Sequence, residues 1–295
     1  MFSFLCKKRR KRQPIDWERA QPVARTIEGR RHRIDTPYLL PQDGQEINRL
    51  DFQHYALRVA LGGDYMAPLE SATTKTILDV GCGTGLWARE RAREFPGAKV
   101  TGIDIESHLP NIPLPPNFQF IQGNVLTGLP FSDSTFDYTH QRLLVGAVPA
   151  QQWPMVLQEL ARVTRPNGWV EVLESGMVYS NAGPATTQFQ SWWQAGEKNL
   201  GFNLAIVPYL DQMLRNTGLR DIHMETLQLP LGKWGGRAGE MLAKDIHAVF
   251  TSFRAVYVSR LGVSAKQFEE ALAVLLEEWE RYHTSYEFYV VYGRR

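Results

Sequence analysis

A glycine-rich loop carries the residue types and spacing that most directly indicate a chemistry in this sequence. The segment Asp79-Val80-Gly81-Cys82-Gly83-Thr84-Gly85 follows an apolar run and precedes a helical pattern. Glycines let the backbone turn tightly and let a ligand approach it, and the free N–H groups of a helix start favour an anionic group. A dinucleotide-binding loop would have its third glycine at Leu86, so the spacing departs from that pattern. The loop is expected to bind another small ligand, or else to be a tight turn that binds none.

Asp79 and Asp104 place two carboxylates near this loop. Asp79 lies two positions before Gly81, and Asp104 lies nineteen positions after Gly85. Asp104 is expected at the end of the second strand of a sheet, where a carboxylate can accept hydrogen bonds from both hydroxyl groups of a ribose. Alone, Asp104 would be an ordinary turn residue. Its place after the glycine loop favours a ligand that contains a ribose.

The elements that must hold these residues alternate between apolar runs and helical patterns, which predicts a parallel sheet with crossover helices. Strands are expected at residues 76–80, 99–103, 118–122, 136–140 and 169–173. Helices are expected at residues 46–61, 86–94 and 153–163, with a short helix after Arg142 and a turn at residues 166–168. Later patterns predict helices at residues 186–199, 207–216, 237–260 and 265–283, and strands at residues 219–229 and 286–292.

These elements predict an α/β fold of the Rossmann-like type. Its sheet is expected to have seven strands, mostly parallel, with the last strand (residues 286–292) antiparallel. Residues 36–295 would form one domain, in which residues 70–182 are the ligand-binding core and residues 219–229 and 286–292 add the last strands. A helical cap is expected from residues 36–62, 183–218 and 236–283.

Composition and charge place the chain among globular enzymes and binding proteins. The 295 residues carry a net charge of +2, but residues 1–33 hold eleven Lys or Arg and three Asp or Glu, which is +8 and leaves about −6 for the rest. Residues 1–35 are therefore expected to be a basic, flexible tail. The tail could instead touch an anionic membrane, with Cys6 as an acylation site, or serve as a nuclear address. A basic face on the folded domain is not indicated, so no nucleic-acid partner is expected.

Two further features bear on the compartment. The sequence has no run of 18 apolar residues and no secretory signal at its start. Its two cysteines, Cys6 and Cys82, cannot form a disulfide framework or a four-ligand zinc site. We expect a cytoplasmic protein without a structural metal ion. Its oligomeric state is not indicated.

Several short motifs around the glycine loop resemble those of a known family. They are Tyr38-Leu39-Leu40-Pro41 with Asp43 and Glu46, Arg49-Leu50-Asp51-Phe52-Gln53-His54, Phe136-Asp137-Tyr138 leading into His140-Gln141-Arg142, and Pro166-Asn167-Gly168-Trp169-Val170-Glu171. With an acid two positions before GxGxG, they resemble a class I S-adenosylmethionine-dependent methyltransferase over residues 38–176. Within that class the chain resembles the group that contains the velvet-associated methyltransferase regulators of fungal secondary metabolism. The likeness does not fix a reaction.

The resemblance implies S-adenosylmethionine as the cofactor and a set of residues that bind it. It implies that residues 36–62 fold over the cofactor as a lid, that the end of the third strand contacts the adenine ring, and that Gln141 contacts the cofactor just past the fourth strand. The predicted cofactor-binding residues are Asp79, Gly81, Cys82, Gly83, Gly85, Asp104, Ile105, Asn124, Val125 and Gln141. Asn124 could accept from the adenine amino group or donate to a ring nitrogen.

Methyl transfer from a sulfonium needs few catalytic side chains, because the cofactor supplies the reactive carbon. His140 is the first candidate base and His54 the second, since an imidazole titrates near neutral pH. Packing of His140 and a helix-surface role for His54 are the alternatives. No base at all is also compatible with the chemistry.

The acceptor is expected to be a small molecule. Tyr38, Arg142, Trp193 and His247 are the candidate substrate-binding residues; Arg142 could bind a carboxylate or form an ion pair. Trp192, Trp193, Trp234, Tyr209 and Phe250 suit an apolar or aromatic acceptor or a cationic amine, although such rings could also be core. Methylation at oxygen, nitrogen or carbon is the leading hypothesis. A regulatory protein that acts through a partner, and an enzyme that uses the sulfonium without methylating, are the alternatives.

Overall fold

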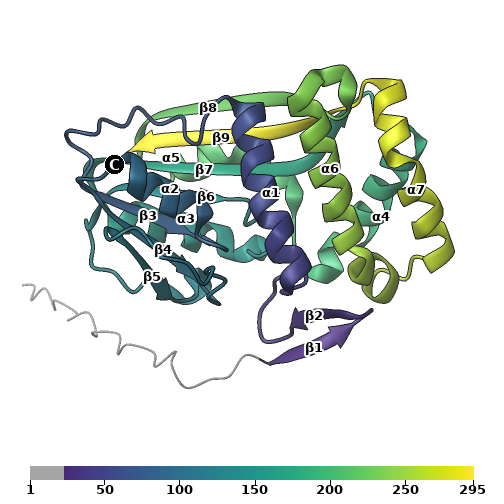
Figure 1. Cartoon of the computed structure of the whole chain (residues 1–295), viewed down its shortest axis with the longest axis horizontal. Helices are drawn as coiled ribbons and strands as arrows, with labels where there is room; N and C mark the ends of the chain where they lie inside the picture. Colours follow the sequence, from purple (N-terminus) through teal and green to yellow (C-terminus); the bar gives the residue numbers. More distant parts are fainter. Residues whose placement is uncertain (1–22) are drawn as a thin grey trace, which may run out of the picture.

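The computed structural model of this chain describes residues 23–295. A seven-stranded sheet forms the centre of the fold, in the order β5-β4-β3-β6-β7-β9-β8 (Figure 1). The strands are β3 (Thr76–Val80), β4 (Lys99–Asp104), β5 (Phe118–Gln122), β6 (Phe136–Arg142), β7 (Thr164–Ser180), β8 (Arg220–Pro230) and β9 (Ser285–Arg294). Only β9 runs antiparallel to its neighbours, β7 and β8. The predicted Rossmann-like fold with an antiparallel last strand is confirmed.

Apolar side chains on both faces of the central strands bury the sheet between helices. Ile77 packs with Trp87 of α2 (Leu86–Glu94), whereas its neighbour Leu78 faces the other way and packs with Leu157 of α3 (Trp153–Val163). All four side chains are at most 2% exposed. Because successive residues of a strand point to opposite faces, a continuous apolar run is what such a doubly covered strand requires.

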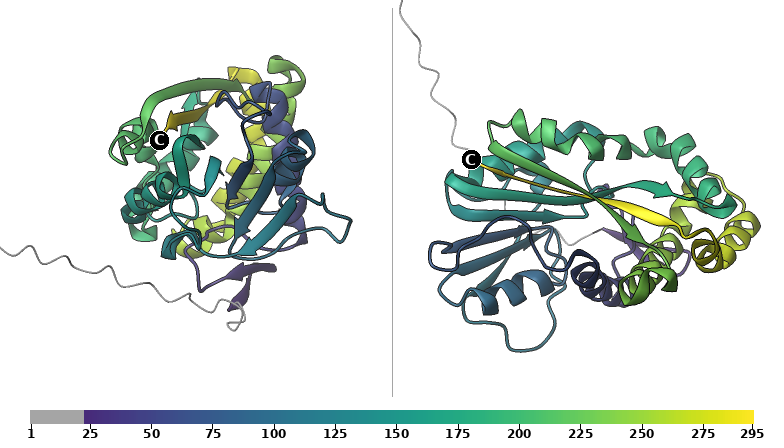
Figure 2. Two further views of the ribbon diagram at one scale, coloured as in Figure 1. Left: turned by 90° about the vertical axis from the view of Figure 1, so that its left-hand side faces the viewer. Right: turned by 90° about the horizontal axis from the view of Figure 1, so that it is seen from above.

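Four long helices form the cap beyond the carboxyl ends of the parallel strands β3–β6 (Figure 1). They are α1 (Gly44–Leu61), α4 (Pro184–Leu200), α6 (Gly236–Ser252) and α7 (Ala265–Tyr282). α1 packs along α6, although the two are almost 200 residues apart in sequence. The view from above shows these cap helices gathered at one end of the molecule (Figure 2). They share one apolar core that includes Leu57, Phe189, Phe250 and Trp279.

Part of the segment that is expected to be a flexible tail is ordered. Residues 24–33 form a hairpin of β1 (Ala24–Ile27) and β2 (Arg30–Arg33), so only residues 1–22 of the predicted tail, with Cys6 and the lysine and arginine run, lie outside the described residues. Arginines of the hairpin are paired with acids of the domain: Arg30 with Asp43, and Arg31 with Glu106. These two arginines of the predicted tail are therefore paired with acids of the domain.

The segment after Arg142 also differs from its prediction. β6 and β7 are longer than expected, and residues 143–149 form turns followed by the 3-10 helix Ala150–Gln152 instead of a helix. The carboxylate of Glu174 accepts the N–H groups of Leu144 and Val145, at 2.8 and 3.0 Å, which holds these groups in a loop.

The remaining differences are local. The expected turn at residues 166–168 lies inside β7, residues 204–209 are a 3-10 helix before α5 (Leu210–Arg215), and the helix from 237 ends at Ser252 before a π-helical turn, Val256–Arg260. Two more 3-10 turns occupy Val125–Thr127 and Lys233–Gly235.

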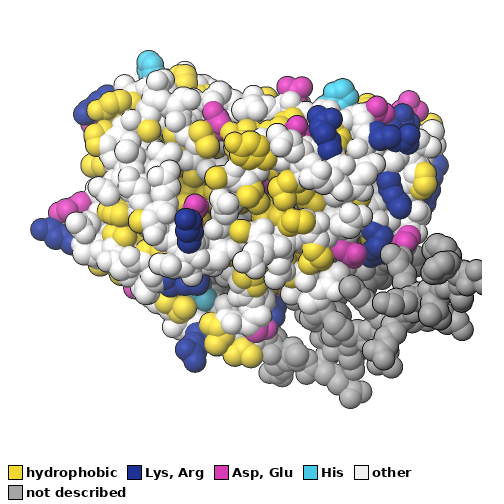
Figure 3. All heavy atoms as spheres, turned by 180° about the vertical axis from the view of Figure 1, so that it is seen from behind, with side chains coloured by type: hydrophobic (Ala, Val, Ile, Leu, Met, Phe, Trp, Pro, Cys, Tyr) yellow, Lys and Arg dark blue, Asp and Glu magenta, His cyan; other side chains and the backbone are white. Residues whose placement is uncertain are grey.

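None of the described helices is long and apolar enough to cross a membrane. On the face seen from behind, cationic and anionic side chains lie close together near the edges, unlike the basic face typical of nucleic-acid binding (Figure 3).

Candidate functional site

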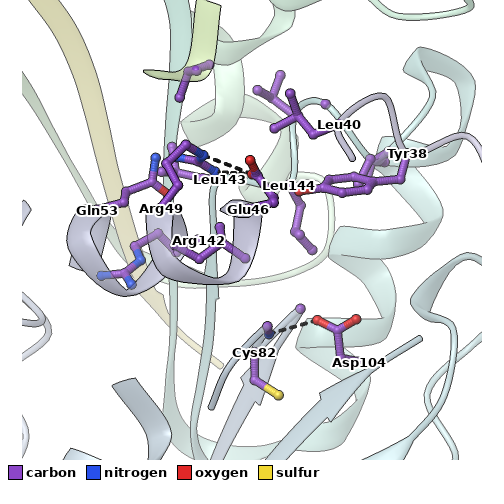
Figure 4. Close-up of a pocket in the computed structure, with 18 of the residues that line it drawn as sticks. Tyr38, Leu40, Glu46, Arg49, Gln53, Cys82, Asp104, Arg142, Leu143 and Leu144 are labelled. Carbon is purple, nitrogen blue, oxygen red and sulfur yellow. Dashed lines mark hydrogen bonds and ion pairs between the residues drawn. The ribbon is translucent and has the colours of Figure 1, made fainter. Parts of the chain in front are cut away.

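A cavity of about 260 Å³ opens at the carboxyl ends of β3, β4 and β6. Its floor is the glycine loop, and its walls come from the segment 36–42, from α1 and from cap residues of α4 and α6. Ligands of open parallel sheets bind at this edge, where the strand order reverses. Figure 4 shows the cavity between the glycine loop and α1, with Cys82 and Asp104 at the loop and Glu46, Arg49 and Gln53 on α1.

The glycines of the loop have distinct roles. Gly81 has a φ of +71°, and a Cβ there would lie 2.5 Å from Leu144 Cδ2, so the position has no room for a side chain. Gly81, Cys82 and Gly83 line the cavity. Gly85 does not. Its φ is +68° and its carbonyl accepts the Arg89 N–H at the start of α2, so it forms the turn into the helix.

Asp104 is held with its carboxylate at the cavity wall. Its Oδ2 accepts the Gly83 N–H at 2.8 Å, and Ile105 beside it also lines the cavity. Burial raises the pKa of this carboxyl, although the Gly83 hydrogen bond opposes the effect. A carboxylate offers about four acceptor positions, so Asp104 can still accept from a ligand. The fold therefore places Asp104 in the cavity wall, and its binding of a ribose stays a prediction.

Asn124 and Val125 line the cavity beyond Asp104. The Asn124 Oδ1 accepts the Leu126 N–H at 2.9 Å and so caps the short 3-10 helix that begins at Val125. The side-chain oxygen is thus partly occupied, and the amide NH₂ group is the better candidate for a ligand contact. Of the two predicted modes, donation to a ring nitrogen fits this arrangement better.

His140 and Gln141 do not line the cavity, which argues against both predictions made for them. The His140 Nδ1 bonds Asp79 Oδ1 at 2.8 Å, and its ring stacks on Trp87 at 3.9 Å. Gln141 is fully buried and donates to Glu174 at 3.4 Å. β6 continues to Arg142, so both residues lie within the sheet and Arg142 alone of the three reaches the cavity. His140 is therefore buried beside the cavity, with its Nδ1 engaged by Asp79.

The other predicted residues divide in the same way. Asp79, His54, Tyr38, Arg142 and Trp193 line the cavity. His247 does not, because its Nε2 contacts the Leu272 carbonyl at 3.3 Å on the side of α6 that faces α7. Ile246, Val249, Phe250 and Phe253 line the cavity instead, at spacings that share one face of a helix.

Both ring nitrogens of His54 are engaged. Nε2 lies 2.7 Å from Glu90 Oε2, and Nδ1 lies 3.3 Å from a guanidinium nitrogen of Arg142. Burial, and next the charge of Arg142, lower the pKa of His54 to about 4, so the ring is neutral near pH 7. With Nε2–H donating to Glu90 and Nδ1 accepting from Arg142, neither nitrogen is available as a general base.

His54, Asp64 and Glu90 are also close enough to hold a metal ion, since their ligand atoms lie within 4.8 Å of one another. Arg58 forms ion pairs with both carboxylates, and Arg91 lies 2.7 Å from Asp64. The arginines supply the positive charge that a metal ion would bring. The cluster is therefore an ion-pair network that ties α1 to α2.

A second polar cluster, between α1 and α6, was not predicted. Arg49 lies 2.6 Å from Glu46 and 3.0 Å from Asp245, and Gln53 donates to Asp245 at 3.0 Å. Ser252 donates to the other oxygen of Glu46 at 3.1 Å. Burial raises the pKa of Asp245, and Arg49 opposes this. Arg49 and Glu46, three positions apart in a helix, were the only sequence signal; Asp245 could not be linked to them.

Aromatic and aliphatic side chains line the end of the cavity away from the glycine loop. Trp193 and Phe250 were predicted there; Phe253, Tyr257 and Phe288 were not. Further residues of this end are Ser175, Met177, Tyr179, Leu204, Ile246, Val249 and Tyr286. Trp192 lies outside the lining, whereas Tyr209 and Trp234 are 56% and 39% exposed. We call this set the aromatic end of the cavity.

Comparison with known proteins identifies the family. Residues 52–224 match a family described as a methyltransferase domain. The chain belongs to this family. It is 29% identical to the N-methyltransferase sirN of Leptosphaeria maculans over 88% of this chain and 95% of that protein. It is also 29% identical to the secondary metabolism regulator LAE1 of Cochliobolus heterostrophus over 67% of each chain, so the predicted resemblance is confirmed.

A solved structure has the same fold. The phosphoethanolamine N-methyltransferase 2 of Haemonchus contortus, in complex with S-adenosyl-L-methionine, superposes with a TM-score of 0.50 at 15% identity. The match covers 84% of this chain and 52% of the Haemonchus contortus chain, so this chain spans about half the length of that protein.

Proposed function

We propose that this methyltransferase transfers the methyl group of S-adenosylmethionine to a small molecule bound at the aromatic end. The observation that carries the proposal is Asp104, a carboxylate in the cavity wall fixed by Gly83 of the glycine loop. A ribose at Asp104 would lie beside Gly81, Cys82 and Gly83, which line the same cavity. The resemblance and the family membership support the same cofactor.

The residues around Asp104 fit an adenosine. Gln42 lines the cavity, is 8% exposed, and its Oε1 has no hydrogen-bond partner among the described residues. A buried acceptor of this kind is costly unless a ligand satisfies it. Asn124 lies beyond Asp104 with an amide NH₂ group available. A ligand with hydroxyl and amino donors and ring-nitrogen acceptors therefore matches the groups that the cavity presents.

The chemistry asks little of the protein beyond positioning. When bound, the cofactor supplies an electrophilic methyl carbon: an acceptor lone pair forms the new bond, the C–S electrons return to sulfur, and the acceptor loses a proton. Tyr38 lines the cavity, and burial raises the pKa of its phenol, so it stays protonated and can donate a hydrogen bond but not remove a proton. We infer that no side chain acts as a base and that the proton leaves to water.

The aromatic end defines the acceptor class. Two charged residues of the cavity wall, Glu46 and Arg49, form an ion pair, and Arg49 also pairs with Asp245. Beyond them the wall consists mainly of rings and aliphatic side chains. Such a wall favours an uncharged apolar or aromatic molecule, with nitrogen or oxygen as the methylated atom, and it can also hold an amine against a ring face.

Two measurements test the proposal. Calorimetric titration of the full chain with S-adenosylhomocysteine should show one site, and the absence of binding would refute it. Incubation with methyl-labelled S-adenosylmethionine and a metabolite extract from the source organism should then place label in a small molecule. Release of S-adenosylhomocysteine during turnover would exclude a cofactor that acts only through its charge.

The similarity to a secondary-metabolism regulator favours one second candidate, a protein that keeps the cofactor site and acts through a partner. Deleting residues 1–22 leaves the β1–β2 hairpin and its ion pairs intact. If turnover of a small molecule survives this deletion, the result supports the proposal that the protein is an enzyme. Cofactor binding without label in any small molecule, together with loss of a defined partner on deletion, would favour the regulator.

A further inference from the structure

Arg142 is a guanidinium in the cavity wall that lacks an acidic partner. No carboxylate oxygen of residues 23–295 lies within 4.0 Å of its guanidinium, which contacts His54 Nδ1 at 3.3 Å. The acids nearest to it are already engaged: Asp79 with His140, Asp64 with Arg91, and Asp245 with Arg49. A charge removed from water without a counter-ion is unfavourable, so the position is suited to an anionic ligand.

The sheet order decides which ligand group reaches this arginine. β3, which leads into the glycine loop, has β4 on one side and β6 on the other. Asp104 ends β4 and Arg142 ends β6, so the backbones that carry the two charges lie on either side of β3, about 10 Å apart, which is twice the spacing of neighbouring strands. Figure 4 shows them on opposite sides of Cys82. A ligand whose ribose lies at Asp104 and which crosses Gly81 brings its far end to Arg142.

His54 holds the guanidinium without neutralising it. Glu90 accepts from the Nε2–H, which leaves the Nδ1 lone pair to accept from Arg142. A carboxylate in place of His54 would form an ion pair and cancel the charge, whereas a neutral imidazole fixes the side chain and leaves its positive charge for a ligand.

We propose that Arg142 binds the carboxylate at the amino-acid end of S-adenosylmethionine, with His54 as its positioning residue. This inference rests on the proposed function and replaces the expectation that Arg142 binds an acceptor carboxylate. The acceptor is proposed to bind at the aromatic end, which is lined by residues of the cap helices α4 and α6 and not by the glycine loop.

The test compares two ligands that differ only in the carboxylate. Wild-type protein and the variants Arg142→Met and Arg142→Lys are titrated with S-adenosylhomocysteine and with its decarboxylated form, S-adenosyl-3-thiopropylamine. Arg142→Met should weaken S-adenosylhomocysteine binding by more than tenfold and leave the decarboxylated ligand within twofold of wild type; Arg142→Lys should be intermediate. Equal loss for both ligands would mean structural damage and would overturn the inference, as would unchanged affinity for both.

The role of His54 is tested by the same ratio of affinities. His54→Phe removes the acceptor, and His54→Asn keeps an oxygen that can accept from Arg142. The ratio of the two ligand affinities should fall several-fold in the phenylalanine variant and recover at least in part in the asparagine variant. An equal ratio in all three proteins would refute the positioning role. If wild-type protein binds neither ligand, the proposed function fails first; if it binds both with unchanged ratios in the variants, only this inference fails.

Discussion

Replacing Asp104 is the most direct perturbation of the proposed cofactor site. In the structure its Oδ2 accepts the Gly83 N–H at 2.8 Å, which leaves lone pairs for ligand hydroxyls. Two ribose hydroxyls that donate to one carboxylate would form two charge-assisted hydrogen bonds, each worth about 1.5 to 3 kcal/mol. Asp104→Ala loses both and also leaves the Gly83 N–H without its partner.

We therefore expect Asp104→Ala to weaken S-adenosylhomocysteine binding by about 3 kcal/mol or more, which is roughly a hundredfold in affinity. Asp104→Asn keeps one acceptor oxygen for Gly83 and for one hydroxyl, so its loss should be roughly tenfold. Glu225→Ala, at an exposed carboxylate on β8, is the matched control and should not change the affinity. The assay is calorimetric titration, with thermal melting of each unliganded variant.

The structure also gives a pH signature. Because burial raises the pKa of Asp104, wild-type affinity should fall as the pH drops through that raised value, where the carboxyl gains a proton and becomes a poorer acceptor. Asp104→Asn should lack this dependence. Affinity of Asp104→Ala within threefold of wild type, in a variant that melts normally, would show that the ribose is bound elsewhere.

Four further predictions test other parts of the structure. Asp43 caps α1 and pairs with Arg30, which lowers the pKa of Asp43 to about 2. Asp43→Ala should therefore lower the unfolding free energy, measured in urea at pH 7, by about 1 to 2 kcal/mol, and this difference should vanish as the pH falls from about 4 to about 2. Asp43→Asn should retain the part of the stability that comes from capping. His54 stays neutral down to about pH 4, so the unfolded chain binds a proton first and stability should fall between about pH 6.5 and pH 4; His54→Asn should flatten that part of the curve. Glu278 accepts two N–H groups at the start of α4, so Glu278→Ala should lower the unfolding free energy by about 3 kcal/mol, and a loss below 1 kcal/mol would contradict this account of how the cap is fixed. Trp193→Ala should raise the acceptor KM roughly tenfold while S-adenosylhomocysteine affinity stays within twofold; a change in cofactor affinity alone would misplace the aromatic end.

Local patterns were enough to predict much of the fold. β3, β5, α2 and α3 begin and end where the sequence predicts, because apolar runs bounded by turn residues specify buried strands and helical spacing specifies covering helices. The glycine loop and Asp104 were found for the same reason. Both follow strands directly, and the ends of parallel strands meet at one edge of a sheet whatever the rest of the chain does.

The tertiary structure alone decided which neighbouring side chain reaches the cavity. His140, Gln141 and Arg142 are consecutive, and because β6 ends at Arg142 instead of His140, only Arg142 of the three lines the cavity. Ile246 and His247 are neighbours on α6, but Ile246 lines the cavity whereas His247 faces α7. Composition cannot settle such choices, because they depend on strand length and helix orientation.

Pairings between distant segments were the other feature that the sequence did not determine. Arg49 meets Asp245, 196 positions away, because α1 packs on α6. A periodic pattern shows that a helix has a buried face but not which helix covers it. The sequence therefore determined the fold, the glycine loop and its acid, whereas the packing of the cap determined the aromatic end and left Arg142 without an acidic partner among residues 23–295.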